Sequence, residues 1–458
     1  MRTRVEEMAD FVCRSSYDRL SAAAREQLKI RFLDALGCAI GALGAPPIEL
    51  LRAQIEDFGG TGLCGLIGGG RTAPDRAAFY NSALVRYLDF NDSYLAVGET
   101  CHPSDNLGAV LAAAEYAGTS GKDCLAALAV AYQVQCRLSD VAPVRAKGFD
   151  HTTQGAYAVA AGVSRALGMD PVRTANAIAI GGTAFNSLRV TRTGALSNWK
   201  GLAYPNTAFA ATHAAFLAMR GVTGPAEVFE GNKGFMESIA GHFELDWSTE
   251  DLERVTHTVV KKYNAEVHSQ STLEGVLELK REHRFEAPEI DKIEVQTFDV
   301  AYNIIGGGEE GDKRRVETKE QADHSLPYMV AVALLDGQVM PVQYLPARVS
   351  APDVQDLLRK VTIRPFAELS RRFPAEMPCR ITITLGNGAL LTKEKADYEG
   401  FSSRPTRWDS VVEKFRSLAG ERTSRPLQDA IVEAVAKLQD VELSVLVRLL
   451  AQVASNCT

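Results

Sequence analysis

A stretch of high polarity runs from Tyr87 to Leu107 and reads YLDFNDSYLAVGETCHPSDNL. Apolar sequence with a helical pattern surrounds it on both sides. A polar cluster is costly to bury unless each member finds a partner, so a chain that keeps one here is expected to use it. We hypothesise that the stretch is half of an active site, with His102 and Asp89 as its main chemical groups.

The same stretch also has a simpler structural interpretation. Pro103 follows His102, which disfavours a helical conformation for that histidine and predicts an extended turn. Ser104 and Asp105 are good N-cap residues for the apolar helix that we expect over 107–117. A capped loop and an active-site wall are compatible, so both interpretations stay open.

A second feature is a long span without acidic residues. From Pro171 to Ala226 there is no Asp or Glu, although the span holds five cations, Arg173, Arg189, Arg192, Lys200 and Arg220. In a chain of net charge −7, such a span indicates a site for anionic groups. A low-charge core with a few solvated cations is the alternative. Lys200, between Trp199 and Gly201, is the cation that we expect to be most desolvated.

Composition is that of an ordinary soluble globular protein, with 46% hydrophobic and 23% charged residues among 458. The negative net charge argues against a general nucleic-acid or membrane surface. None of the eight cysteines forms a CxxC pair, which argues against a zinc or iron–sulfur site. The opening residues MRTRVEEMADF lack an apolar signal-peptide region, so we expect a cytoplasmic protein.

The elements that must position these residues are mostly helices. Ala-rich helical patterns lie near 107–117, 122–140 and 155–168, Asp170-Pro171 starts another helix, and the tail returns to helix at 409–420 and 426–453. Between them, 292–300, 360–365 and 380–395 alternate like strands, the last with a hairpin turn at Asn387-Gly388. Helices are expected near 326–337 and 351–359.

These elements predict a mainly α fold. We expect a large all-helical domain formed by both chain termini and a smaller inserted α+β lid domain. The predicted ranges are 1–267 for the first part of the helical domain, 268–403 for the lid, and 404–458 for the C-terminal helices that complete the helical domain.

Five motifs occur in order along the whole chain: YLDFNDSYLAVGETCHPSDNLGAVLA, KGFDHTTQGAYAVAAG, SNWKGLA, KKYNAEVHSQSTLEG and ADHSLPYMVAVALLDG. Together they resemble the MmgE/PrpD family. The resemblance implies a homodimer and chemistry on small polycarboxylates without a metal or other cofactor. The family includes the dehydratase of the methylcitrate cycle, which handles propionate-derived carbon, and a decarboxylase of cis-aconitate.

The resemblance also assigns site residues. Family active-site positions fall on Asp89, Ser93, His102, His151, Lys200 and His268, and Lys262 joins Ser93 and His268 as a substrate-binding residue. Ser93 replaces a frequent Thr and keeps the hydroxyl. The chain reads F-D-H around His151 where many members read F-H-P, so the register there stays open. A functional Tyr of the decarboxylase branch has only Tyr302 as a weak match, which favours the dehydratase.

Dehydration of 2-methylcitrate needs a base, an acid, and cations that stabilise the charge gathering on a carboxylate. Histidines suit the first two roles, and we expect His102 and His151 to share them in either order. Asp89 would orient an imidazole or act as the base. Lys200, with Arg192 or Arg189, would bind substrate carboxylates.

A lone histidine is more often a hydrogen-bonded core residue than a catalyst. On that interpretation His268 would only hold a turn between the domains, and His324 would cap the helix that begins SLPYMVAV. His213 and His242 are interpreted as structural. The predicted function is therefore a hydro-lyase on 2-methylcitrate, and also on citrate. The alternatives are a cis-aconitate decarboxylase, an epimerase or other polycarboxylate lyase, and a non-catalytic binding protein of the same family.

Overall fold

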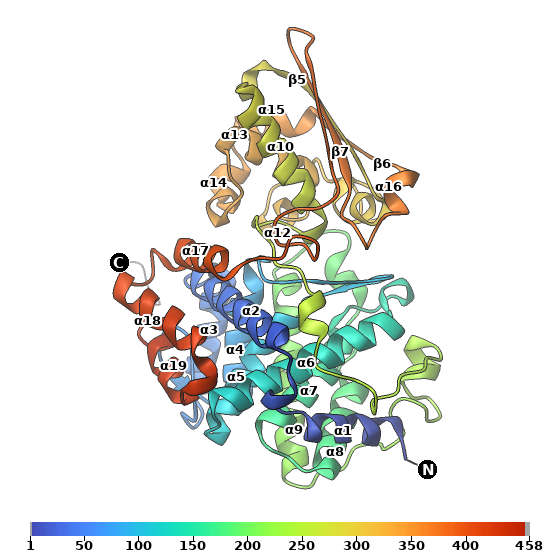
Figure 1. The fold of residues 1–458 in the computed structure, drawn as a ribbon, viewed down its shortest axis with the longest axis vertical. Coiled ribbons are helices and arrows are strands. Elements are labelled where there is room, and N and C mark those ends of the chain that lie inside the picture. The colour runs from blue at the N-terminus through green and yellow to red at the C-terminus, as the bar shows by residue number, and fades with distance from the viewer. Residues whose placement is uncertain (1, 454–458) are drawn as a thin grey trace. The chain divides into compact units, whose positions relative to one another are not determined.

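The computed structural model describes residues 2–453, which are mainly helical and carry one small mixed sheet in the C-terminal region (Figure 1). Contacts between Cα atoms divide the chain into two compact units. The first, here called the helical unit, contains residues up to Thr191, Gly201–Thr258 and Thr406 onward. The second, the sheet unit, contains Arg192–Lys200 and Val259–Pro405. The domain ranges expected from the sequence stay a prediction.

The helical unit is a set of closely packed helices whose buried faces are rich in alanine. Gly108 shows how close the packing is, because a Cβ atom there would lie 2.3 Å from the backbone nitrogen of Ser82 on the neighbouring helix. The helices are α1 (Arg4–Arg14), α2 (Ala22–Gly41), α3 (Pro46–Phe58), α4 (Pro74–Tyr87), α5 (Leu107–Ala117), α6 (Gly121–Val141), α7 (Thr152–Ala166), α8 (Pro171–Ala184), α9 (Trp199–Met219), α17 (Trp408–Ala419), α18 (Arg425–Ala436) and α19 (Leu443–Leu450).

The prediction of an all-helical domain is wrong in one respect. Two short antiparallel pairs interrupt the helices, β1 (Cys64–Gly65) with β2 (Arg71–Thr72) and β3 (Tyr94–Ala96) with β4 (Glu99–Cys101). The second pair lies inside the polar stretch, where Gly98 at φ 83° allows the two-residue turn formed by Val97 and Gly98. This hairpin leads the chain directly into His102.

Two local predictions about helix ends also need correction. Ser104 and Asp105 do not cap α5, because they lie inside a short 3-10 helix, Pro103–Asn106, that runs straight into α5. The helix expected over 426–453 breaks after α18 and resumes as α19, with a 3-10 turn at Leu438–Asp440 between them. α17 packs on α2, so the last helices belong to the same unit as the first ones.

The sheet unit is built around four strands in the order β6-β5-β7-β8. β5 pairs in parallel with β6 and antiparallel with β7, and every second residue of β7 is buried, as expected for a sheet with one covered face. Its main elements are β5 (Ile290–Thr297), β6 (Val361–Pro365), β7 (Cys379–Leu385), β8 (Leu390–Lys395), α10 (Gln270–His283), α12 (Lys319–Ala322), α13 (Leu326–Asp336), α14 (Pro346–Val349), α15 (Pro352–Arg359) and α16 (Ala367–Ser370).

The strand and hairpin predictions for this unit are confirmed. β7 and β8 form the expected hairpin, and Gly388 at φ 83° occupies its turn beside Asn387. α10 packs on β7 and β8, and α13 packs on β6, which buries Leu273 and Val276 of α10 with Ile381 and Ile383 of β7 in one apolar core.

Candidate active site

His102 is held at the end of the β3–β4 hairpin by hydrogen bonds to its imidazole ring. Its Nδ1 lies 2.8 Å from the carbonyl oxygen of Asp92 and 3.1 Å from the hydroxyl oxygen of Ser93. A carbonyl oxygen can only accept, so Nδ1 donates its proton there and the lone pair of the neutral ring is on Nε2. The ring is buried, and Nε2 is the nitrogen that can take up a proton.

Asp92 supports this arrangement from within the polar stretch. Its side-chain oxygens accept hydrogen bonds from the Ser104 backbone N–H (3.0 Å) and the Tyr132 hydroxyl (2.8 Å). Burial raises the pKa of Asp92, and the hydrogen bonds from Ser104 and Tyr132 oppose that rise. Asp92, Ser93, His102 and Ser104 are therefore joined by hydrogen bonds within the stretch.

His151 lies beside His102 in the helical unit. The two ring centroids are 5.5 Å apart with the rings edge to face, and both side chains are buried. Nδ1 of His151 is 3.2 Å from an oxygen of Asp150, whose other oxygen is 3.8 Å from Arg189. The structure thus brings together His102, His151 and Ser93, three of the residues that the sequence assigned to the site.

Tyr204 of α9 is a member of this cluster that the sequence did not suggest. Its ring stacks on His151 at 6.0 Å, and its hydroxyl donates to Asn106 (3.0 Å) and Gln135 (3.1 Å). A Cβ atom at Gly155 would lie 2.5 Å from this ring, so only glycine permits the approach. Burial, and then the charge of Asp105, raise the pKa of Tyr204 well above its usual value.

Asp89 forms an ion pair with Arg86, a residue that the sequence did not assign to the site. Nη1 of Arg86 lies 2.7 Å from Oδ1 of Asp89, and Nε of Arg86 lies 3.6 Å from Oδ2 of Asp105, with all three side chains buried. Asp89 also has a left-handed backbone, with φ 55°, which is costly for a residue other than glycine. Such strain is typical of functional positions.

Lys200 is buried in the sheet unit, as expected for the most desolvated cation. Its Nζ donates to Oδ1 of Asp323 at 2.7 Å and lies 2.9 Å from Nδ1 of His324. Asp323 also accepts an ion pair from Lys319 at 2.7 Å. Burial alone raises the pKa of Asp323, but the charges of Lys200 and Lys319 lower it well below the usual range.

The alternative role given to His324 is wrong. Ser325, not His324, caps α13, because its hydroxyl accepts from the Tyr328 backbone N–H at 3.1 Å. His324 instead lies against Lys200 and 2.8 Å from Asp323. Arg192 reaches the same segment, with Nη1 3.5 Å from the backbone oxygen of Lys200. The sheet unit thus holds a cationic cluster, which we define as Lys200, Lys319, Arg192 and His324 together with the carboxylate of Asp323.

His268 forms a tight pair with Glu266 in the sheet unit. Its Nδ1 lies 2.7 Å from Glu266, whose second oxygen accepts from the His268 backbone N–H at 2.8 Å. The rings of Phe298 and Phe373 pack on the imidazole at 5.7 and 5.5 Å. Its Nε2 is buried and makes no hydrogen bond within residues 2–453.

The Glu266–His268 pair predicts that the protein becomes less stable in acid. Burial raises the pKa of Glu266, but the charges and hydrogen bond of His268 and its neighbours lower it, from 4.5 to about 2. The carboxylate therefore contributes stability that is complete above pH 4.5 and is lost as the pH falls toward 2. We expect Glu266→Gln to remove this part of the pH dependence, measured by urea unfolding between pH 7 and pH 3. The exposed Glu282→Gln is the control, and an unchanged pH dependence in Glu266→Gln would contradict the assignment.

Two predicted binding residues have other visible partners. Arg189 lies near Asp150 and so helps to hold the carboxylate beside His151. Lys262 forms ion pairs with Glu399 at 2.7 Å and Glu274 at 3.5 Å in the sheet unit, and 38% of its side chain is exposed. Their assignment to substrate binding stays a prediction.

The chemistry available in the helical unit is proton transfer. Two buried imidazoles lie edge to face, each with an oxygen acceptor at Nδ1, which leaves both rings able to exchange a proton through Nε2. The chemistry available in the sheet unit is anion binding, because Lys200, Lys319 and Arg192 bring cationic groups to one segment. Among the described residues, all seven cysteines are free; Cys457 lies outside them.

Comparisons with known proteins identify the family of this chain. The chain belongs to the MmgE/PrpD family, whose N-terminal domain matches residues 6–248 and whose C-terminal domain matches residues 263–440. It is 27% identical to the 2-methylcitrate dehydratase of Cupriavidus necator, over 93% of this chain and 92% of that one. It is 29% identical to the 2-methylcitrate dehydratase of Escherichia coli K12, over 74% of this chain and 73% of that one.

A relative with a different activity is almost as similar. The chain is 26% identical to the cis-aconitate decarboxylase of Mus musculus, over 83% of this chain and 79% of that protein. Dehydratases and decarboxylases are both lyases, so the family and its named relatives indicate an enzyme of this broad class. No helix among residues 2–453 is long and apolar enough to cross a membrane.

Proposed function

We propose that this protein is a hydro-lyase that converts 2-methylcitrate, and also citrate, to the corresponding cis-aconitate without a metal ion. The observation that carries the proposal is the buried pair of imidazoles, His102 and His151, with ring centroids 5.5 Å apart. Relatives named 2-methylcitrate dehydratase, similar to this chain over most of its length, support the choice of substrate.

In the proposed reaction, one imidazole Nε2 removes the proton from the carbon that carries the methyl group and a carboxylate. The electron pair of that C–H bond forms the new C=C bond as the C–O bond to the hydroxyl breaks. The other histidine, protonated, gives its proton to the departing hydroxide, which leaves as water. The hydrogen bond at Nδ1 of His102 and the 3.2 Å contact between Nδ1 of His151 and Asp150 would keep Nε2 of each ring in the required orientation.

The negative charge that gathers on the substrate carboxylate needs cations. We assign this task to Lys200, with Arg192 as its partner in the sheet unit. The cations of Lys200, Lys319 and Arg192 are the groups of this cluster that would attract an anionic substrate. Ser93 would bind the substrate or hold the ring of His102, from which it lies 3.1 Å.

The second candidate is a cis-aconitate decarboxylase, favoured by the similarity to the mouse enzyme of that name. It would break a C–C bond and release carbon dioxide, which requires a proton donor but no departing hydroxide. A non-catalytic binding protein of the family is a third candidate. The presence of His102, His151 and Lys200 argues against it.

Purified protein should be given each substrate in turn. We expect 2-methylcitrate to yield the ultraviolet absorbance of a new conjugated double bond, and cis-aconitate to release no carbon dioxide. Activity should survive dialysis against a chelator, because no step of the proposed mechanism uses a metal. Carbon dioxide release from cis-aconitate would assign the decarboxylase instead, and loss of activity with the chelator would contradict the metal-free mechanism.

We also propose that the protein is a cytoplasmic homodimer, as the family resemblance implies. Light scattering on a size-exclusion column tests this, with a mass of about twice the 49.6 kDa chain expected. A mass near that of one chain would contradict it.

A further inference from the structure

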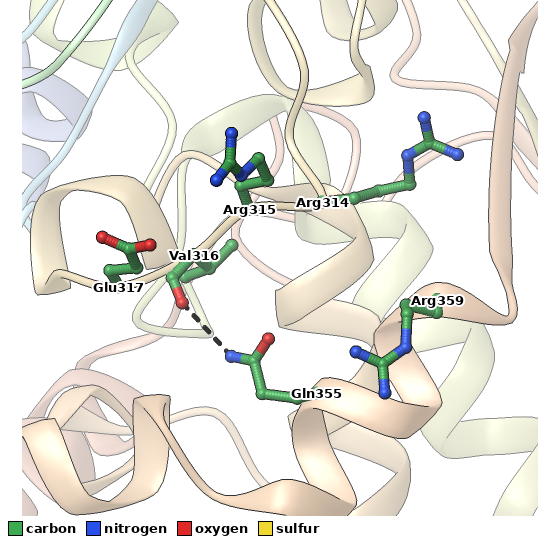
Figure 2. Close-up of a pocket in the computed structure, with 6 residues that line it drawn as sticks. All are labelled: Arg314, Arg315, Val316, Glu317, Gln355 and Arg359. Carbon is green, nitrogen blue, oxygen red and sulfur yellow. Dashed lines mark hydrogen bonds between the residues drawn. The ribbon is translucent and has the colours of Figure 1, made fainter.

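A cavity of about 550 Å³ in the sheet unit is lined mostly by polar and cationic side chains (Figure 2). Its lining comes from two segments, the loop before α12 and the helix α15, and consists of Arg314, Arg315, Val316, Glu317, Gln355 and Arg359. Three of these six residues are arginines in a chain of net charge −7. None of the six belongs to the histidine pair or to the cationic cluster around Lys200.

The loop that carries two of the arginines is fixed in place. The side chain of Gln355 donates to the backbone oxygens of Val316 (3.2 Å) and Val349 (2.7 Å), and Figure 2 shows the first of these bonds joining the loop to α15. Val316 itself is buried in the apolar core. The hydroxyl of Ser325 donates to the Lys313 backbone oxygen. The backbone beside the arginines is therefore held before any ligand arrives.

Two of the three guanidinium groups can exchange their present partners for a ligand, and the third has no such partner among residues 2–453. The side chain of Arg315 makes no hydrogen bond or ion pair with any residue in 2–453. Arg314 pairs with Asp312 at 3.2 Å and Arg359 pairs with Asp356, and these four side chains are all more than half exposed. Exposed pairs of this kind contribute little free energy, so a multiply charged anion can displace them at low cost.

A second cavity of about 320 Å³ is also lined by Arg314. Its other lining residues are mostly uncharged and include Gly306, Gly307, Pro327 and Ile363. A ligand that extended from one cavity into the other would meet guanidinium groups at one end and glycine backbone and apolar side chains at the other. The combined lining suits an organic molecule rather than a bare inorganic ion.

We propose that this cavity is a binding site for a small organic polyanion with two or more carboxylate or phosphate groups, held by Arg315, Arg359 and Arg314. Guanidinium groups bind both kinds of anion through paired N–H donors, so the two sources share one recognition chemistry. The proposal does not depend on the reaction that the protein catalyses.

Isothermal titration calorimetry on the full-length protein tests it, with pyrophosphate and citrate as probes and sodium chloride matching the ionic strength. We expect one of the probes to bind with one site per chain, and Arg315→Gln or Arg359→Gln to weaken that binding at least tenfold. The control is Arg371→Gln, which removes an exposed arginine of the same unit that does not line the cavity. Its affinity should stay within twofold of the wild type.

The possible outcomes distinguish a phosphate ligand from a polycarboxylate ligand, and this cavity from the proposed active site. Binding of pyrophosphate that Arg315→Gln weakens assigns a phosphate ligand, and binding of citrate that the same change weakens assigns a polycarboxylate. Citrate binding that is lost in Lys200→Ala but unchanged in Arg315→Gln belongs to the proposed active site, and the proposal is overturned if Arg315→Gln also leaves pyrophosphate binding unchanged. Failure of both probes to bind, or equal weakening by Arg371→Gln, also overturns it.

Discussion

Replacing His102 by alanine is expected to lower kcat for 2-methylcitrate by about 10²–10⁴-fold, the usual contribution of a positioned general acid or base. The imidazole is buried and its Nδ1 donates to the Asp92 carbonyl oxygen, so Nε2 is the nitrogen that we expect to transfer the proton. KM should change much less than kcat, because the proposed role of His102 lies in the transition state rather than in binding.

The matched control for His102→Ala is His213→Ala. His213 is also in the helical unit, but its side chain is 57% exposed and pairs with Asp75. Steady-state kinetics on both variants, with circular dichroism to verify folding, should show near wild-type turnover only for the control. Turnover near the wild-type value in a folded His102→Ala variant would contradict the assignment.

Asp323→Asn is expected to reduce the free energy of unfolding by about 3–5 kcal/mol, the usual cost of removing one partner of a buried ion pair. Two ammonium groups, of Lys200 and Lys319, each lie 2.7 Å from this fully buried carboxylate. An asparagine would remove the negative charge that pairs with the buried Lys200 and the partly exposed Lys319. Urea unfolding at pH 7 measures the change.

The control for Asp323→Asn is Asp356→Asn, which removes one side of an exposed ion pair and should change stability by less than about 1 kcal/mol. The pH dependence gives a second test. Because the folded-state pKa of Asp323 is lowered, its contribution is complete above the unfolded value near pH 4 and is lost as the pH falls below it. A variant as stable as the wild type at pH 7 would contradict the role of this carboxylate.

Much of the helical unit can be predicted from local sequence patterns. His102 and Ser93 lie nine residues apart and meet because a two-residue turn at Gly98 folds the segment between them. The sequence indicated the polar stretch but not the hairpin, since Tyr94–Ala96 and Glu99–Cys101 are each too short for an alternating pattern to be visible. The same short lengths explain why an all-helical domain was expected.

Contacts between distant residues could not be predicted. Lys200 and Asp323 are 123 positions apart, and no local pattern links a buried lysine to its carboxylate. In the sequence, Arg86 is indistinguishable from other arginines on amphipathic helices. Its position between Asp89 and Asp105 is visible only in the structure. Tyr204 follows the SNWKGLA motif within an apolar helix, where an aromatic residue predicts only core packing. In each case the contact depends on the tertiary structure, which local sequence patterns do not reveal.

Proton NMR of 2-methylcitrate incubated with the protein in D₂O tests the central claim most directly. Elimination removes the hydrogen next to the methyl group, so the methyl doublet of the substrate should be replaced by a singlet of the unsaturated product. We expect this conversion with the wild type and its loss in a folded His102→Ala, His151→Ala double variant. An unchanged doublet with the wild type, or equal conversion by the double variant, would contradict the assignment of this histidine pair as the acid and base of a dehydratase.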